Sequence, residues 1–289
     1  MLIDTHVHVV SDDLGRYPLN PGHATNPWYV THPCSGSRLR ALMAEAGVDG
    51  AVLVQGVGAY QFDNSYTLAA AAEAPGVFTS VVCTDRSTPD ALGVVRDIIV
   101  RRGARGFRWV TFAEDGRLAE PRALWELLGT LAVPVVLTAL ADRLPEIAEL
   151  VPRLPALPLA LDHCAFADLS RGVPDELAAL AAFPNLYLKV STHALHSAAA
   201  GGDPADAVAE LAARFAGRIM WGSDWSQTHH APYPDIVEEG RRAAAKCTAA
   251  QRDAYFAGSA CTLWPELRGG RRVRSRPGST TEPDAPRTR

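Results

Sequence analysis

Short apolar runs alternate with longer amphipathic segments along most of the chain. Runs such as residues 51–54 (AVLV) and 133–137 (VPVVL) show no regular polar alternation. Continuous apolar runs of this length are typical of strands in a parallel sheet that helices cover on both faces. The pattern predicts eight strands, at residues 3–10, 50–55, 77–83, 105–110, 133–139, 157–163, 185–191 and 219–224.

A helical segment follows each predicted strand. After the third strand, residues 87–90 (STPD) combine a capping residue, an early proline and an acidic first turn. The other helices are expected at residues 37–46, 64–74, 121–131, 144–150, 174–182, 204–216 and 234–245, with a last one at 249–257. Eight such units predict a closed parallel sheet, so we expect a single α/β domain, a (β/α)8 TIM-type barrel, over residues 1–267. An open doubly wound sheet is the alternative, but no glycine-rich phosphate loop follows any strand.

Charge is distributed unevenly between this domain and the end of the chain. The formal net charge is −4, but residues 268–289 hold seven Arg against Glu282 and Asp284, so residues 1–267 carry −9. An acidic body argues against a nucleic-acid-binding surface. The last segment is rich in Arg, Pro, Gly, Ser and Thr, so we expect residues 268–289 to form a disordered tail.

Cysteine content and hydropathy bear on the compartment. The five Cys are odd in number and show no C-x-x-C spacing, which fits a reducing environment better than a disulfide framework. No basic-then-apolar leader precedes the first strand, and no apolar run reaches the roughly 18 residues that span a bilayer. We expect a cytoplasmic protein with no membrane or nucleic-acid partner. The sequence does not indicate an oligomeric state.

The first predicted strand carries two histidines, His6 and His8. Side chains alternate faces along a strand, so both imidazoles point the same way. Buried polar groups need partners, and the two rings could simply be hydrogen-bonded core histidines. The pairing on one face nevertheless favours a functional site.

A carboxylate near the other end of the chain strengthens this interpretation. Residues 218–226 predict a short apolar strand that ends in Gly222-Ser223-Asp224. Barrel enzymes place their catalytic groups at the carboxyl ends of the strands. If the first and last strands are neighbours in a closed barrel, Asp224 lies beside His6 and His8.

Other polar groups are expected at the same end of the barrel. Strand five ends in Thr138 and offers no His or Lys, while the remaining strand ends contribute Gln55, Arg108, Asp162, His163, Lys189 and Ser191. The two cations could instead pair with the acidic body of the protein. The long connection at residues 11–34, which contains Trp28, is typical of a binding loop.

Several short motifs occur together along the chain. They are IDTHVHVV (3–10), RYPLNP (16–21), VLVQ (52–55) with Asp63-Asn64, GFRW (106–109), LDH (161–163), LKVS (188–191), MWGSDW (220–225) and GSACTLW (258–264). On these motifs the chain resembles the amidohydrolase-related (amidohydrolase 2) proteins, and within them the branch of 2-pyrone-4,6-dicarboxylate lactonase and sugar lactonases. The likeness extends over residues 1–267.

The resemblance implies a distorted eight-stranded barrel that hydrolyses a small cyclic ester. It implies that Asp224 activates water, that His6, His8 and His163 polarise the lactone carbonyl, and that Arg108 holds a substrate carboxylate. We also expect substrate contacts from four further residues: Gln55, Asn64, Lys189 and Trp28.

Two positions depart from the pattern of the family. The branch carries an arginine three residues after the histidine of strand six, where this chain has Phe166, so the dicarboxylate itself is not the expected substrate. Metal-dependent relatives place a ligand at the end of strand five, where this chain has Thr138. We therefore expect that no cofactor is required.

Two alternative functions stay open at this stage. A metal-dependent decarboxylase or amidohydrolase would hold one Zn²⁺ or Mn²⁺ on His6, His8 and Asp224, since three protein ligands suffice for a catalytic zinc. A barrel that binds a ligand without catalysis is the alternative of another class, but a pure binding protein needs no base at strand eight. Each of the three interpretations implies a small-molecule partner.

Overall fold

The computed structural model of the protein describes residues 1–21, 26–111 and 118–269. It contains eight strands, all pairing in parallel, which confirms the predicted α/β barrel class. The strands are β1 (Ile3–Val7), β2 (Gly50–Val54), β3 (Phe78–Val81), β4 (Phe107–Val110), β5 (Val135–Thr138), β6 (Leu159–Leu161), β7 (Leu186–Ser191) and β8 (Ile219–Gly222).

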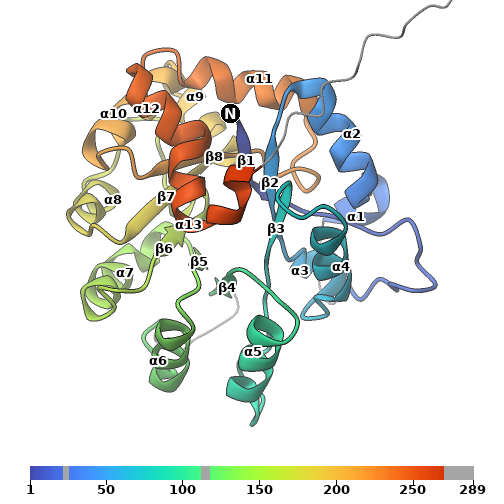
Figure 1. Ribbon diagram of the computed structural model, residues 1–289. Helices are drawn as coiled ribbons and strands as arrows, with labels where there is room; N and C mark the ends of the chain where they lie inside the picture. The colour runs from blue at the N-terminus through green and yellow to red at the C-terminus, as the bar shows by residue number, and fades with distance from the viewer. Residues whose placement is uncertain (22–25, 112–117, 270–289) are drawn as a thin grey trace, which may run out of the picture.

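Helices surround these central strands (Figure 1). The helices expected after each strand are α2 (Gly36–Ala46), α4 (Ser65–Glu73), α5 (Ala91–Val100), α6 (Arg122–Leu131), α7 (Leu144–Leu150), α8 (Asp175–Ala179), α10 (Pro204–Arg214) and α11 (Tyr233–Ala243). The other α-helices of the described residues are α1 (Trp28–Thr31), α3 (Val57–Tyr60), α9 (Thr192–Ala199), α12 (Ala249–Asp253) and α13 (Ser259–Leu263). The remaining turns are η1 (Ala141–Arg143), η2 (Val151–Arg153), η3 (Asp162–Phe166), η4 (Leu180–Ala182), η5 (Ala254–Gly258, π-helical) and η6 (Pro265–Gly269).

Three sequence expectations need correction here. Helix α9 lies in a segment that we expected to be a connection; Leu195 is its one large apolar side chain and the rest of its apolar face is alanine, so its amphipathic pattern is weak. The last predicted helix, 249–257, continues to Leu263 through the π-helical turn. Arg268 and Gly269, which we expected in the tail, belong to η6; residues 270–289 lie outside the described residues, and their assignment to a tail stays a prediction.

The barrel wall consists of two sheets rather than one. Strands β1–β3 form the first and β4–β8 the second. Isolated bridges join them at Val7 with Trp225 and at Val82 with Phe107. We call these two places the β1–β8 seam and the β3–β4 seam.

The β1–β8 seam requires a glycine. A Cβ added to Gly222 would lie 2.8 Å from the Cβ of His6, so any side chain there would force the two strands apart. The backbone N–H of Asp224 donates to the carbonyl oxygen of His6 at 2.8 Å across this seam. The predicted meeting of the first and last strands is therefore present, and it depends on close approach of their backbones.

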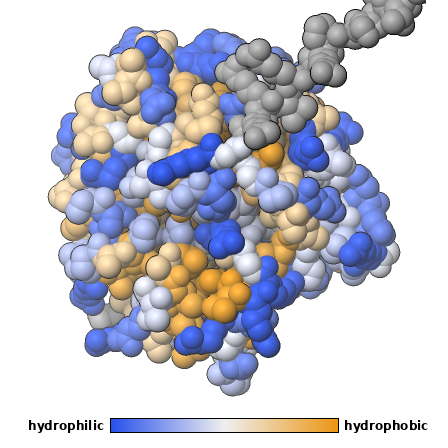
Figure 2. Space-filling view, in the orientation of Figure 1, coloured by the Kyte–Doolittle hydropathy of each residue, from blue (hydrophilic) through white to orange (hydrophobic). Residues whose placement is uncertain are grey.

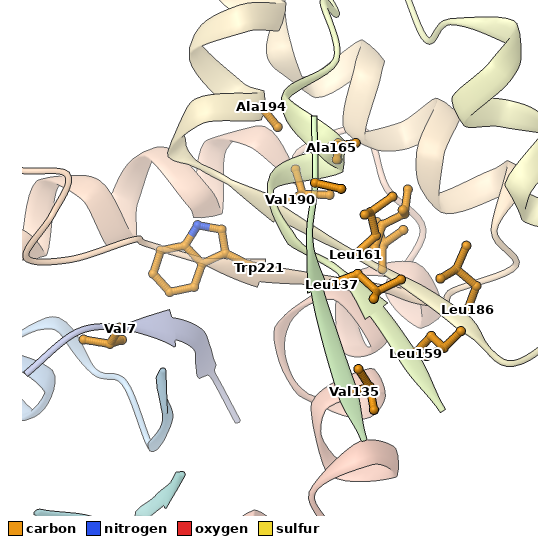
Figure 3. Packing of buried hydrophobic residues seen from close by; sticks show 14 of the residues in the cluster. Val7, Val135, Leu137, Leu159, Leu161, Ala165, Leu186, Val190, Ala194 and Trp221 are labelled. Carbon is orange, nitrogen blue, oxygen red and sulfur yellow. The ribbon is translucent and has the colours of Figure 1, made fainter. Parts of the chain in front are cut away.

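Apolar side chains fill the barrel on both sides of its wall. Between strands and helices, Leu137 of β5 and Leu161 of β6 occupy paired positions in one cluster (Figure 3). Inside the barrel a second cluster, which includes Ile3, Val136 and Trp264, closes the amino-terminal end. This packing leaves only the carboxyl ends of the strands for polar groups that point inward.

The outer surface is mixed in character. Figure 2 shows a largely hydrophilic face with one apolar area in its lower half. In the three described ranges, no helix combines the length and apolar character that crossing a bilayer demands.

Candidate active site

His6 in β1 and His8, which directly follows that strand, lie at the carboxyl end of the barrel strands. Ile3 points into the inner apolar cluster, and strict alternation would send His6 to the opposite face. A register shift between Asp4 and Val7 turns His6 inward, so both imidazoles face the barrel axis. Both rings are buried, with their centroids 5.0 Å apart.

Asp224 meets the two histidines from the far side of the seam. It follows β8 with a left-handed backbone (φ 60°), a conformation that non-glycine residues adopt at a cost of about 1 kcal/mol or more and mainly at functional sites. Its Oδ1 lies 3.5 Å from Nε2 of His6 and 3.3 Å from Nε2 of His8. The structure thus brings together the three residues expected at the centre of the site.

These three atoms are buried and lack hydrogen-bond partners among the described residues. His8 Nδ1 lies 2.9 Å from the carbonyl oxygen of Val54, which can only accept, so Nδ1 carries the proton and Nε2 a lone pair. Nδ1 of His6 lies 3.1 Å from a carboxylate oxygen of Asp162, which assigns the same tautomer. Two lone pairs and a carboxylate oxygen therefore face one another.

A divalent cation would satisfy all three acceptors at once. Two imidazole nitrogens and one carboxylate oxygen form a usual protein ligand set for Zn²⁺, and the three atoms lie within 4.8 Å of one another. The residues present therefore fit a metal ion. This geometry favours a bound metal more strongly than the sequence did.

Asp162 connects the cluster of His6, His8 and Asp224 to the barrel interior. Its Oδ1 contacts His6 and lies 3.2 Å from Nζ of Lys189, and its Oδ2 accepts a hydrogen bond from the Thr138 hydroxyl at 2.6 Å. Burial alone would raise the pKa of Asp162, but His6 and Lys189 outweigh it and hold that pKa well below its usual range. Burial lowers the pKa of Lys189, which Asp162 partly offsets.

Lys189 points inward, as expected, but it is wholly buried. Its ammonium lies between Asp162 and the ring of Trp264, whose centroid is 5.7 Å away. This position supports Asp162 and offers no route to a substrate. We therefore assign Lys189 a positioning role in place of the substrate contact expected from the sequence.

Arg108 projects from β4 into the same network. Its Nε donates to the Thr138 hydroxyl at 3.0 Å, and its Nη1 donates to the carbonyl oxygen of Gln55 at 3.1 Å. The side chain retains 9% exposure. Within the described part of the chain Nη2 has no hydrogen-bond partner, so the outer edge of the guanidinium can still receive a carboxylate.

The two amide side chains expected to bind substrate are occupied by the protein. Gln55 donates to the carbonyl oxygens of Gln61 and Asp63 and accepts from the Thr67 hydroxyl. Asn64 donates to two carbonyl oxygens and accepts from the backbone N–H of Cys83. Neither amide keeps a free donor, so this geometry gives them a structural role and we do not carry them into the proposed function.

Trp28 lies beside the site. Its ring centroid is 5.5 Å from that of His8, and a Cβ on Gly56 would approach the indole to 3.2 Å. The indole is almost completely buried. It therefore packs beside His8 as part of the wall of the site, and its contact with a substrate stays a prediction.

His163 lies in an unusual backbone segment. Residues His163, Cys164, Ala165 and Phe166 all have φ between 51° and 57°, a left-handed turn without glycine. The turn puts the His163 ring 4.6 Å from the His6 ring, with Nδ1 2.7 Å from the Ser191 hydroxyl. Burial lowers the pKa of His163 to about 4, so the ring is neutral at pH 7.

Sequence reasoning missed His193, which reaches the site from α9. Its Nε2 lies 3.1 Å from Oδ2 of Asp224, and the Thr228 hydroxyl donates to the same oxygen at 2.8 Å. The hydrogen bond to Asp224 raises the pKa of His193, whose side chain is 43% exposed. Burial would raise the pKa of Asp224, but the hydrogen bond from His193 outweighs it and holds that pKa well below its usual range, so this carboxylate is ionised.

Structural neighbours share this architecture. A Pseudomonas putida protein with the provisional name 2-pyrone-4,6-dicarboxylic acid hydrolase is 26% identical, with a TM-score of 0.73 over 91% of this chain and 97% of that one. An amidohydrolase from Burkholderia multivorans with bound zinc is 20% identical (TM-score 0.69, 92% and 99% covered). The 2,6-dihydroxybenzoate decarboxylase from Rhizobium is 14% identical (TM-score 0.64, 91% and 98% covered).

The family assignment rests on the sequence itself. The amidohydrolase family pattern matches residues 3–265, from the first strand to the last helical turn. The match includes both halves of the cluster, His6 and His8 at one end and Asp224 at the other. With the hydrolases among its neighbours, this indicates an enzyme of hydrolase type, and the chain belongs to the amidohydrolase family.

Proposed function

We propose that the protein hydrolyses a small lactone that carries one carboxylate. The observation that carries the proposal is the buried meeting of His6, His8 and Asp224, with His193 on the solvent side of the carboxylate. The name of the Pseudomonas putida neighbour, a pyrone dicarboxylic acid hydrolase, supports the same class of substrate.

His6, His8 and Asp224 would hold one divalent ion such as Zn²⁺ or Mn²⁺. When bound, such an ion supplies a Lewis acid that polarises a carbonyl and makes a nearby water more acidic. The expectation that no metal is required stays untested, and the three facing acceptor atoms argue against it.

Asp224 and His193 can transfer the proton that hydrolysis requires. Asp224 is ionised and can accept a proton from the attacking water, whose oxygen bonds to the carbonyl carbon. The ring C–O bond breaks, and the leaving oxygen takes up a proton to give a hydroxy acid. His193 bonds to Asp224 and is half-exposed, so it is placed to carry the proton between the carboxylate and the leaving oxygen.

Neutral His163 can stabilise the charge that grows on the carbonyl oxygen. When the Ser191 hydroxyl donates to Nδ1, the ring proton is on Nε2, which is then a donor for the substrate. The imidazolium form is disfavoured by burial. His163 therefore acts as a hydrogen-bond donor and not as a base.

The surroundings of these groups define the substrate class. The free edge of Arg108 can receive one carboxylate. Phe166, in place of a second arginine, puts an apolar ring 4.6 Å from His163 and 5.3 Å from His193. We therefore propose a preference for a monocarboxylate lactone with an apolar substituent over a dicarboxylate.

Decarboxylation is a second candidate function. The Rhizobium decarboxylase has the same fold, and the same cluster could hold a carboxylated aromatic ring. A lactonase and a decarboxylase differ in product. The first forms a hydroxy acid, whose ionisation consumes base, and the second releases carbon dioxide.

One experiment separates the candidates. The purified protein is stripped with chelator, reloaded with Zn²⁺ or Mn²⁺, and assayed by base consumption on three lactones that carry zero, one and two carboxylates. Carbon dioxide release is followed in parallel with 2,6-dihydroxybenzoate. Fastest turnover of the monocarboxylate lactone supports the proposal. Carbon dioxide release without lactone hydrolysis would replace it with the decarboxylase, and tight binding without turnover would indicate a ligand-binding barrel.

A further inference from the structure

A second group of metal-ligating side chains lies at the rim of the barrel, outside the candidate active site. Nε2 of His230 lies 3.0 and 3.2 Å from the two carboxylate oxygens of Glu239, and Nε2 of His196 lies 3.6 Å from one of them. The two imidazole rings meet edge to face at 4.4 Å. We call these three residues the rim cluster.

The rim cluster has the donors and the reach of a metal site. Its three ligand atoms lie within 4.8 Å of one another. Two imidazoles and a carboxylate form a common zinc ligand set, and partial exposure leaves room for water to complete a tetrahedron. Among these contacts only His230 is within hydrogen-bond distance of Glu239, whereas Nε2 of His196, at 3.6 Å, is close to the carboxylate without a hydrogen bond to it.

The three side chains come from three separate segments. His196 belongs to α9, Glu239 belongs to α11, and His230 lies in the connection from β8 that also carries Asp224. His196 follows His193 by three residues, so both lie on one side of α9. An ion held by the rim cluster would tie α9, with its contact to Asp224, to the segment that carries Asp224 itself.

We propose that His196, His230 and Glu239 form a second, peripheral site for a transition-metal ion of the Zn²⁺ type. The site fixes the β8–α11 connection against α9. It is separate from the His6–His8–Asp224 cluster, and the proposal holds whether or not that cluster binds metal.

Zinc chloride alone serves as the probe. Chelator-stripped protein is dialysed against a graded series of zinc concentrations, and bound zinc per chain is measured for the wild type, for E239Q and for H230Q. H32Q is the matched control, because His32 is an exposed histidine outside the rim cluster that stacks on His229. We expect E239Q and H230Q to lose one zinc per chain or to weaken one affinity at least tenfold, while H32Q binds like the wild type.

A second variant distinguishes zinc bound at the rim cluster from zinc bound at the His6–His8–Asp224 cluster. H8Q removes a ligand of the central cluster, so it should retain the zinc that E239Q loses. Circular dichroism at each zinc concentration verifies that every variant is folded, and cobalt absorption provides an independent readout of tetrahedral coordination. Equal zinc content and equal affinity in the wild type, E239Q and H230Q would overturn the proposal and leave the rim cluster a hydrogen-bonded group only.

Discussion

Replacing Asp224 by Asn should abolish activity without destabilising the metal-free protein. In the wild type, Oδ1 faces the lone pairs of His6 and His8. An asparagine amide can turn its NH₂ toward these nitrogens and keep its oxygen toward Thr228 and His193. In the wild type three acceptor atoms face one another, whereas in the variant the amide NH₂ can donate to Nε2 of both His6 and His8.

The magnitude follows from these bonds. An unsatisfied buried acceptor costs about 1–3 kcal/mol, and two of them gain a donor. Weakening the two charge-assisted bonds to Oδ2 loses about 1 kcal/mol each. The free energy of unfolding should therefore rise by about 0–4 kcal/mol, or up to about 12 °C in melting temperature. Loss of the base should lower kcat by about 10²–10⁴.

Asp162→Asn is the matched control, and we expect it to lower the free energy of unfolding. Asp162 faces donors only: His6, Lys189, Thr138 and Arg108. An amide NH₂ there would oppose a donor and leave buried cations without their counter-charge, which costs about 3–5 kcal/mol.

Urea unfolding and thermal melts of both variants are measured in chelator at pH 8, where an ordinary histidine is neutral. If D224N loses more than about 1 kcal/mol under these conditions, the two Nε2 atoms are donors and the assigned tautomers are wrong.

Three further predictions concern the substrate clamp, the seam and the tail. R108K should raise KM on a monocarboxylate lactone by about 10- to 100-fold and change a neutral lactone little, because lysine lacks the planar fork; equal losses would make Arg108 a scaffold residue. G222A should lower stability by about 1–3 kcal/mol through its clash with His6, whereas G129A, where a Cβ meets nothing within 4 Å, should not; equal melts would contradict the close seam. Removing residues 270–289 should leave melting temperature and activity unchanged, and a drop of several degrees would show that this segment packs on the barrel.

The repetition of apolar runs predicted the barrel correctly because eight buried strands leave a strong periodic signal. The pairing of His6 and His8 with Asp224 was also predictable, since closure brings the first and last strands together. His193 was not, because α9 carries no apolar stripe strong enough to identify it and its partner lies 31 residues further along the chain. The roles of Gln55 and Lys189 depend on their hydrogen-bond and ion-pair partners, which only the folded structure reveals.

The division of the wall into two sheets has a consequence for how the enzyme assembles. His6 belongs to β1 of the β1–β3 sheet and His8 directly follows that strand, while Asp224 follows the last strand of the other sheet. The cluster therefore does not exist until the two sheets have docked, and a cation held by it would act as a cross-link that stabilises only the docked form. In hydrogen exchange, withdrawal of such an ion should first deprotect the amides of His8 and Asp224, which bond across the β1–β8 seam. Catalytic competence would then depend on the docking of the two sheets.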